Sequence, residues 1–511
     1  MVNRFIAGPI QEKMTLSKRS SQTVSKFLWA LVLLCLPVTS FRYFPLFGSG
    51  TVVRPLALYP LVLLLAILAY RFWRGEFDQK ILPNSQLLLL FASLVVFTGV
   101  LGGLETLAEG TSASFTGRFL RALVTILIGF GFYFAAAAMN RSVDQVRFSL
   151  LWLVVGLGLT FIWGSIQFYG LKHGLRGELL EFQNLFSVRG LVKNKRVSGF
   201  AYEPSWLANQ LVTVYFPWII GSLTVGIGMF QSKLITSRFG KFDWLVTDLL
   251  LLIAASALLL FTYSRSGLAV LAASLLLTIA LTGTQALKSS FAWFFKPKPE
   301  KRALGLLTRF GIVLVFVGGI AGIVYFLTDK GYISAFFQKN TDNIFDYLQK
   351  AYLGPRFAYL VAAISAAIER PFSGVGLGAS GFWVLENMPD WALAGNAEIA
   401  RLLSPSTNIF PNPKNLFVRV LAETGIFGFI LLVLYFLSLF GMALYLLESS
   451  RNKPEDRWTR LVGIAGVFGV TAVILGGFSQ DSFAMPELWI TPGILAGFFQ
   501  AHQNQQRGQQ E

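Results

Sequence analysis

Residues 84–104 read NSQLLLLFASLVVFTGVLGGL and contain no Lys or Arg, Asp or Glu. A helix of this length is about 30 Å long, which matches the hydrocarbon core of a bilayer. Similar apolar runs recur along the chain. They predict an all-α fold, a polytopic integral membrane protein with about twelve transmembrane helices, at 27–46, 55–73, 84–104, 119–139, 148–170, 200–230, 244–263, 266–287, 305–327, 415–447, 460–479 and 485–501.

The composition of the whole chain supports this class. Of the 511 residues, 54% are hydrophobic and 14% are charged, and the mean hydropathy is +0.60. Soluble domains carry about 25% charged residues, so a soluble enzyme and a disordered chain are excluded. The runs are continuous rather than alternating, which argues against a transmembrane β-barrel. A single cysteine, Cys35, cannot form an internal disulfide, and two histidines leave little room for histidine-based zinc sites or catalysis.

The basic residues predict the orientation of the helices. The chain has 43 Lys and Arg against 26 Asp and Glu, a formal net charge of +17. With the N-terminus in the cytoplasm, every short loop rich in basic residues falls on the cytoplasmic side, as the positive-inside rule requires, and the C-terminus returns there. The first apolar segment could instead be a signal peptide. No small-residue cleavage site follows it, so we favour a retained span.

Two loops on the outer side break this rule. Residues 171–199 hold six Lys and Arg, and residues 328–414 hold seven. Long loops can cross the membrane regardless of charge; the alternative is an outward-facing cationic surface for an anionic ligand. The predicted organisation is a basic cytoplasmic segment (1–26), helices 1–9 with the basic outer loop (27–327), a large structured extracytoplasmic loop (328–414), helices 10–12 (415–501) and a cytoplasmic tail (502–511).

Four polar stretches lie at the outer ends of the predicted helices, where ionisable groups mark candidate sites. They are RVSGFAYEPSW (196–206), TYSRSG (262–267), GPRFAY (354–359) and NPKNLFVRVLAETGIFG (412–428). Glu203 could act on a sugar hydroxyl, or it could only complement the dipole of a helix that starts at Pro204. Arg265 could bind a phosphate through two hydrogen bonds, or snorkel from a tight turn.

The third and fourth stretches leave similar alternatives. Arg356 starts a predicted helix of the large outer loop, where an arginine is often only a solvated surface residue. Glu423 lies about two turns inside a span, where it could satisfy a bond between helices. Gly425 predicts a break in that helix or a close approach of another backbone.

In this order, the pieces RVSGFAYEP, TYSRSGLAVLAAS, GPRFAYLVAAISAAIERPFSGVGLG and NPKNLFVRVLAETGIFG resemble the O-antigen ligase and O-antigen polymerase superfamily. The resemblance covers about Arg196 to Gly428 and includes the large outer loop before the last spans. It implies a GT-C-like, metal-independent, inverting glycosyltransferase without a cofactor. It also implies cell-surface polysaccharide biosynthesis on the outer face of the bacterial inner (plasma) membrane.

The same resemblance implies the partners. The donor would be an undecaprenyl-diphosphate-linked glycan, and the acceptor a glycan or a lipid-linked glycan. A chain-length regulator is a further candidate partner. The net positive charge of the chain is then explained by the positive-inside rule for membrane proteins, and no nucleic acid partner is expected.

The resemblance also implies two groups of site residues. A departing diphosphate needs positive charge where negative charge develops, and arginines supply it without titrating. The arginines of the catalytic group would hold the diphosphate, and its carboxylate would position or deprotonate the acceptor: Glu203, Arg265 and Arg356. A second group would bind substrate, with its glutamate supporting the site from farther away: Arg196, Tyr202, Lys414, Asn415 and Glu423.

One departure from the family pattern bears on the reaction. Lipopolysaccharide ligases of the family carry a histidine before the last long span, whereas this chain has NPKN there and no histidine between His173 and His502. This favours a polymerase of repeat units, such as an exopolysaccharide polymerase, over a ligase that uses a lipid acceptor. Lys414 or Asn415 would take the place of the histidine.

Two other classes compete with an enzyme. A transporter, for example of inorganic carbon within the same superfamily, should show charged or broken helices near the membrane midplane in two matched halves. A flippase or scaffold of the same pathway should show a polar cavity that reaches both sides. No such repeat is visible, and the charges singled out lie near one face, which favours an enzyme.

Overall fold

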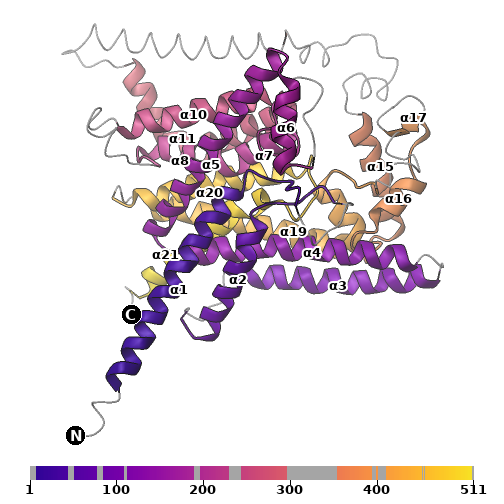
Figure 1. Ribbon diagram of the computed structural model, residues 1–511, viewed down its shortest axis with the longest axis horizontal. Helices are drawn as coiled ribbons and strands as arrows, with labels where there is room; N and C mark the ends of the chain where they lie inside the picture. Colours follow the sequence, from indigo (N-terminus) through magenta and orange to yellow (C-terminus); the bar gives the residue numbers. More distant parts are fainter. Residues whose placement is uncertain are drawn as a thin grey trace.

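The computed structural model describes residues 7–43, 51–76, 84–108, 112–188, 196–229, 243–295, 354–393, 410–451 and 455–508, together with Thr328, Ile399, Ala400 and Lys453. This part of the chain is helical, with two isolated β-bridges and no strand. Figure 1 shows its helices, which are α1 (Ala7–Cys35), α2 (Leu58–Trp73), α3 (Ser85–Ala108), α4 (Ser112–Met139), α5 (Val143–Lys172), α6 (Arg176–Phe186), α7 (Pro204–Gln210), η2 (Leu211–Tyr215), α8 (Phe216–Val225), α10 (Asp243–Phe261), α11 (Arg265–Phe295), α15 (Gly354–Glu369), α16 (Ser380–Glu386), α17 (Asp390–Leu393), α19 (Leu416–Ser449), α20 (Arg457–Gly476), η6 (Pro486–Leu488) and α21 (Ile490–Arg507).

Six of the described helices are long and apolar enough to cross a membrane: Ser85–Leu104, Phe115–Met139, Val143–Lys172, Arg265–Thr282, Leu416–Ser449 and Arg457–Gly476. Three shorter apolar helices accompany them, at Ser20–Cys35, Leu58–Trp73 and Leu245–Phe261. The prediction of a polytopic helical protein is therefore confirmed for this part of the chain, and the number of twelve spans stays a prediction. The expected span at 305–327 lies outside the described residues.

Three predicted segments are not continuous helices over their expected lengths. The helix expected at 27–46 ends at Cys35, just before Pro37, and residues 38–43 are not helical. The segment at 200–230 starts with a turn and is divided into α7, a π-helical turn (η2) and α8. The segment at 485–501 begins with η6, and its helix α21 starts only at Ile490. These differences place irregular backbone where continuous helix was predicted.

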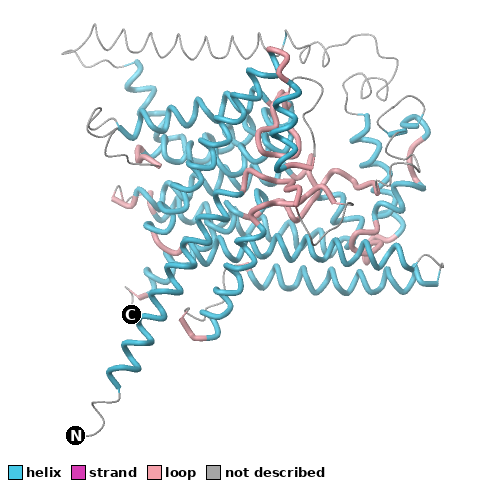
Figure 2. The backbone as a smooth tube through the Cα atoms, in the orientation of Figure 1, coloured by secondary structure: helices cyan, strands magenta, loops and turns pink. Residues whose placement is uncertain are grey.

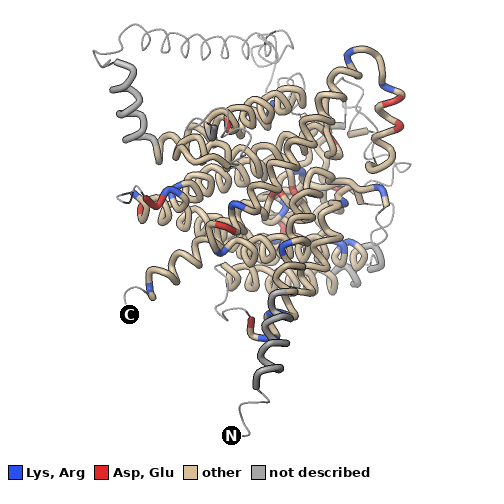
Figure 3. The backbone as a smooth tube through the Cα atoms, turned by 60° about the vertical axis from the view of Figure 1, so that its left-hand side comes forward, with Lys and Arg blue, Asp and Glu red and all other residues tan. Residues whose placement is uncertain are grey.

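Helix α20 forms the centre of the bundle and packs against α8, α11, α19 and α21 (Figure 1). A Cβ at Gly463, Gly466 or Gly469 would lie 2.9 Å or less from a side chain of α19 or α21. Small residues of this kind let membrane helices approach closely. Most of the helical tube is free of charged residues, as the tan colour of Figure 3 shows.

Helix α19 is broken at Gly425, as the sequence predicted. Its backbone there has φ 64° and ψ −169°, which is far from helical. The segment after α15 binds across the break: Val375 and Gly376 donate backbone N–H to the carbonyls of Ala422 and Glu423, at 2.9 and 3.1 Å, and Ile426 donates to Pro371 at 2.8 Å. The interrupted helix thus finds its hydrogen-bond partners in another segment, as buried backbone groups require.

Helices α15, α16 and α17 lie beside the end of the α3–α4 hairpin at which α3 and α4 join (Figure 1). Phe115 of α4 packs with Val375, Ala379 and Ala422 in one small apolar cluster. A Cβ at Gly102 of α3 would lie 2.6 Å from the Val375 carbonyl oxygen. Residues 371–380 are therefore held between α3, α4 and the break of α19, and we call them the cap loop. Figure 2 shows loop segments running together at this end of the bundle.

Candidate functional site

The first stretch, RVSGFAYEPSW, is held by two side chains of α5. Gln167 of α5 accepts hydrogen bonds from the backbone N–H of Ser198 (3.2 Å) and Gly199 (2.8 Å), and it donates to the Gly199 carbonyl. Trp163 of α5 donates to the same carbonyl at 3.1 Å. Gly199 has a positive φ of 56°, which glycine adopts without strain. This clamp fixes the turn that leads into Glu203.

Glu203 is the N-cap residue of α7, and Pro204 occupies the first helical turn, where its missing N–H costs nothing. The Glu203 side chain makes no capping hydrogen bond to the helix. Its Oε1 instead accepts the hydroxyl of Ser205 at 2.5 Å. Tyr202 lies next to Trp206, with ring centroids 5.0 Å apart, and its backbone N–H is bound by Thr39. A carboxylate and an aromatic pair therefore stand together at the start of α7.

The second stretch, TYSRSG, joins the first directly. Arg196 donates from Nε to the Thr262 carbonyl oxygen at 2.8 Å, and Val197 donates its N–H to the Phe261 carbonyl at 3.0 Å. Arg265 is the first residue of α11. Gly267, the third residue of that helix, lies so close to α7 that a Cβ would be 2.7 Å from the Ala208 Cβ. Glu203 and Arg265 thus start two helices that pack against each other.

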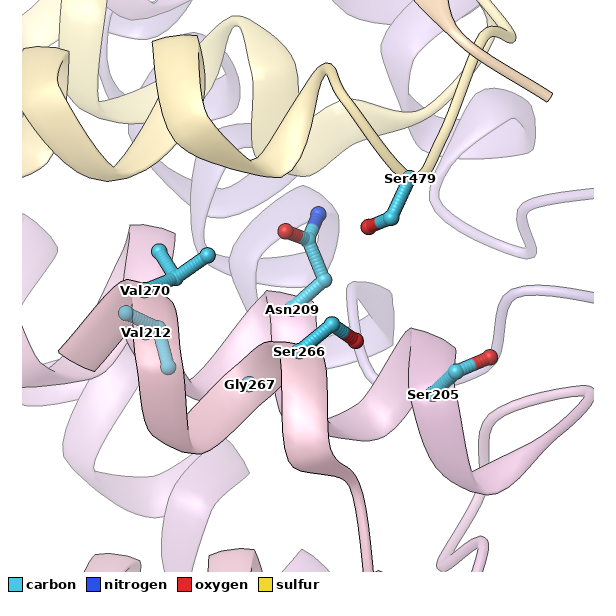
Figure 4. A pocket seen from close by; sticks show the side chains of 7 residues that line it. All are labelled: Ser205, Asn209, Val212, Ser266, Gly267, Val270 and Ser479. Carbon is cyan, nitrogen blue, oxygen red and sulfur yellow. The ribbon is translucent and has the colours of Figure 1, made fainter. Parts of the chain in front are cut away.

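A narrow crevice lies between these two helices, as Figure 4 shows. Its polar lining consists of hydroxyls and an amide, with no cation or carboxylate among the seven lining residues: Ser205, Asn209, Val212, Ser266, Gly267, Val270 and Ser479. Ser205 also binds Glu203, and Ser266 follows Arg265 in the chain. The crevice therefore lies between the first turns of α7 and α11, the helices that begin at Glu203 and Arg265.

Ser479 belongs to the turn that follows α20, residues 477–483, which we call the bridging turn. Within it, the Gln480 Oε1 accepts a hydrogen bond from Asn209 of α7 at 2.7 Å. The Gly477 carbonyl accepts the backbone N–H of Leu416 at 2.7 Å, and Asp481 Oδ2 accepts that of Lys414 at 3.1 Å. The bridging turn therefore connects the first stretch to the fourth, although neither is near it in sequence.

A buried ion pair completes the fourth stretch. Arg419 Nε lies 3.2 Å from Glu423 Oε2, and its Nη1 donates to the Asp481 carbonyl oxygen at 2.7 Å. Glu423 also accepts the hydroxyl of Ser380, at the start of α16, at 2.7 Å. Burial raises the pKa of the Asp481 carboxyl, the nearby positive charge of Arg419 opposes this shift, and the charge of Glu423 adds to it. Through Ser380 and the Asp481 carbonyl, this ion pair connects the cap loop to the bridging turn.

Lys414 and Asn415 have different positions. Asn415 is the N-cap of α19 and its Oδ1 accepts the N–H groups of Phe417 and Val418. Lys414 has φ 52°, an uncommon conformation for a residue with a Cβ. Its Nζ lies 4.6 Å from the ring centroid of Tyr359, which is one turn along α15 from the exposed Arg356. The third stretch thus meets the fourth through Tyr359.

The four stretches predicted from the sequence are therefore linked to one another. Arg196 contacts the second stretch, and Glu203 and Arg265 begin the two helices that border the crevice. The bridging turn contributes Ser479 to the crevice and contacts the fourth stretch through Asp481. Arg356 is the most remote, because only its neighbour Tyr359 contacts Lys414. Among the residues that the structure describes, no group of three His, Cys, Asp or Glu side chains could hold a metal ion.

Sequence reasoning missed several residues that build this region. Arg419 could have been found, because an arginine four residues before Glu423 is the spacing of an ion pair on one helix face. The polar run FSQD at 478–481 between two apolar segments was a second signal. Arg118 of α4, whose Cζ lies 3.8 Å from the Phe410 ring centroid, had no signal that distinguished it from a snorkelling arginine.

Comparison with known protein families supports the resemblance of these stretches. Residues 250–433 match the family model described as O-antigen ligase. The match covers 184 of the 511 residues, and we call this segment the O-antigen ligase domain. This domain contains Arg265, Arg356 and the whole fourth stretch, and the expectation of this family is confirmed there. The family acts on lipid-linked glycans, as ligases or polymerases. No curated protein matches the chain.

The O-antigen ligase domain does not contain the whole candidate site. Glu203 and Asn209 of α7 precede the matched residues, and the bridging turn follows them. Both nevertheless contact the domain, through the α7–α11 packing and the Lys414–Asp481 hydrogen bond. The chain around the domain therefore supplies part of the candidate site.

Proposed function

We propose that this membrane protein is an inverting glycosyltransferase that polymerises lipid-diphosphate-linked glycan units at the outer face of the bacterial inner membrane. The observation that carries the proposal is the series of contacts that links the four polar stretches, which are far apart in the sequence. The carboxylate residue Glu203 is the N-cap of α7, the guanidinium residue Arg265 begins α11, and these two helices border a hydroxyl-lined crevice. Transfer of a sugar from a diphosphate needs both kinds of group.

In the proposed reaction, the acceptor hydroxyl oxygen bonds to the anomeric carbon from the face opposite the diphosphate. The bond between that carbon and the diphosphate oxygen breaks, and its electron pair leaves with the lipid diphosphate. Glu203 takes the hydroxyl proton. Arg265 stabilises the charge that develops on the diphosphate, because its planar fork can form two parallel hydrogen bonds to phosphate oxygens.

The remaining predicted residues receive supporting roles in this proposal. Arg196 holds the turn before Arg265, and Tyr202 with Trp206 offers an aromatic surface beside Glu203. Asn415 already caps α19, so of the two candidates Lys414 is the better replacement for the family histidine. Arg356 would contact the substrate from α15, and Glu423 supports the site through its ion pair with Arg419.

The test is a mass-resolved analysis of lipid-linked glycans in cells that carry the wild-type protein or Arg265→Ala. Accumulation of single repeat units on the lipid carrier in the variant supports a polymerase. Accumulation of long lipid-linked polymers would identify a ligase that uses a lipid acceptor. An unchanged pool would refute the enzyme and leave a transporter as the second candidate.

A further inference from the structure

Arg419 binds its own helix and the bridging turn with one side chain. Its Nε lies 3.2 and 3.3 Å from the two carboxylate oxygens of Glu423, four residues on in the same helix. Its Nη1 donates to the Asp481 carbonyl oxygen at 2.7 Å, and its Cζ lies 5.8 Å from the ring centroid of Phe483. A planar guanidinium can bond in two directions at once, which an ammonium on a flexible chain cannot reproduce.

The position of Asp481 in turn determines that of Lys414. The Asp481 carboxylate accepts the backbone N–H of Lys414 at 3.1 Å. Lys414 has a left-handed backbone with φ 52°, which an L-residue adopts only when its surroundings impose it. In this conformation its ammonium lies over the Tyr359 ring of α15.

We propose that Arg419 is a positioning residue, which fixes the bridging turn through the Asp481 backbone and thereby sets the conformation and place of Lys414. This rests on the proposed function, in which Lys414 contributes to the site. Arg419 itself does not touch substrate, because its side chain is only 12% exposed and that of Glu423 only 3%. Its effect reaches the site through Lys414.

The first measurement is steady-state transfer by the purified full-length protein in lipid nanodiscs. The donor is the lipid-linked glycan extracted from cells that lack the protein. Arg419→Lys keeps the charge but loses one of the two directions of bonding. We expect kcat to fall about 10- to 100-fold with KM nearly unchanged, because displacement of a group by about 1 Å can cost about 100-fold in rate. Arg451→Lys is the matched control, since it alters an exposed arginine–glutamate pair at the other end of α19 and should leave kcat unchanged.

A double-mutant cycle separates positioning from a merely structural role. If Arg419 acts through Lys414, Arg419→Lys should lower kcat much less in a Lys414→Ala background than in the wild type. The same fold-change in both backgrounds would overturn the proposal. Wild-type kcat in the Arg419→Lys variant would overturn it too.

A second readout does not depend on activity. A membrane-impermeant amine reagent should modify Lys414 several-fold faster in Arg419→Lys than in the wild type, with other lysines as internal references by mass spectrometry. Unchanged labelling would overturn the proposal. If Arg419→Lys fails to fold, Glu423→Gln, which weakens the same ion pair while keeping a hydrogen-bonding oxygen, is measured in both assays with the same criteria. If the wild type transfers no glycan, the proposed function fails, while the labelling result still decides the positioning.

Discussion

Replacing Gly374 by alanine should release the cap loop from α19. Gly374 has φ 65°, and a Cβ there would lie 2.4 Å from the Glu423 carbonyl carbon and 2.5 Å from the Thr424 nitrogen. These are backbone atoms, so they cannot turn aside as a side chain does. The left-handed conformation costs an L-residue about 1–2 kcal/mol and an extra methyl in a packed site about 1–3 kcal/mol, so the sum is about 2–5 kcal/mol.

This cost should appear as local opening of the cap loop. Hydrogen–deuterium exchange of the peptide containing Val375 and Gly376 should become about 30- to 4,000-fold faster, because each 1.4 kcal/mol is a factor of ten. The two amides donate to Ala422 and Glu423 across the helix break, so they report this contact directly. Glycan transfer should fall with it.

Gly441→Ala is the control for this experiment. Gly441 lies in α19, the helix on which the cap loop packs, and a Cβ there would meet nothing within 4 Å. Alanine is favoured over glycine in a helix by about 1 kcal/mol, so exchange of the cap loop should not accelerate. Equal exchange of the cap-loop peptide in Gly374→Ala and the wild type would refute the close packing of this loop on α19.

Three further predictions concern the site and the topology. Arg265→Lys keeps the charge but loses the bidentate fork, so transfer should fall at least about tenfold with normal membrane insertion; near-normal transfer would contradict the diphosphate role. A periplasmic reporter fused near Trp391 should be active, and activity of a cytoplasmic reporter there would overturn the one-sided arrangement. Because burial raises the pKa of Asp481 above its ordinary value of 3.8, its stabilising contribution is present below that value and is lost as pH rises through the raised value. Asp481→Asn should flatten the dependence of Tm on pH in the range where Asp481 titrates. An unchanged slope would show that another group causes the pH dependence there.

The sequence predicted those features of the fold that depend on local chemistry. Long apolar runs predicted helices such as α3 and α5, because burying apolar surface and satisfying the backbone within one segment need no partner. Pro204 predicted the start of α7, and Gly425 predicted the break in α19. Both residues act on their own backbone, so the sequence around each was sufficient.

Other features depend on contacts between distant segments and could not be predicted in this way. The π-helical turn at Leu211–Tyr215 lies in a run that reads as a continuous helix. Asp481 is 67 residues from Lys414, and Gln480 is 271 residues from Asn209, yet both pairs are hydrogen-bonded. The role of the bridging turn follows from where α20 ends beside α7 and α19, which hydropathy does not determine.

The location of the charged groups favours a one-sided enzyme over a transporter. A transporter needs polar or charged groups near the membrane midplane to carry its substrate across. The central helix α20 has no charged residue from Leu461 to Gly476, and it packs against its neighbours through glycines. The buried ion pair Arg419–Glu423 instead lies between the start of α19 and its break at Gly425, beside the turn at the end of α20. A substrate that stays at one face, with its lipid in the outer leaflet, needs charges only there.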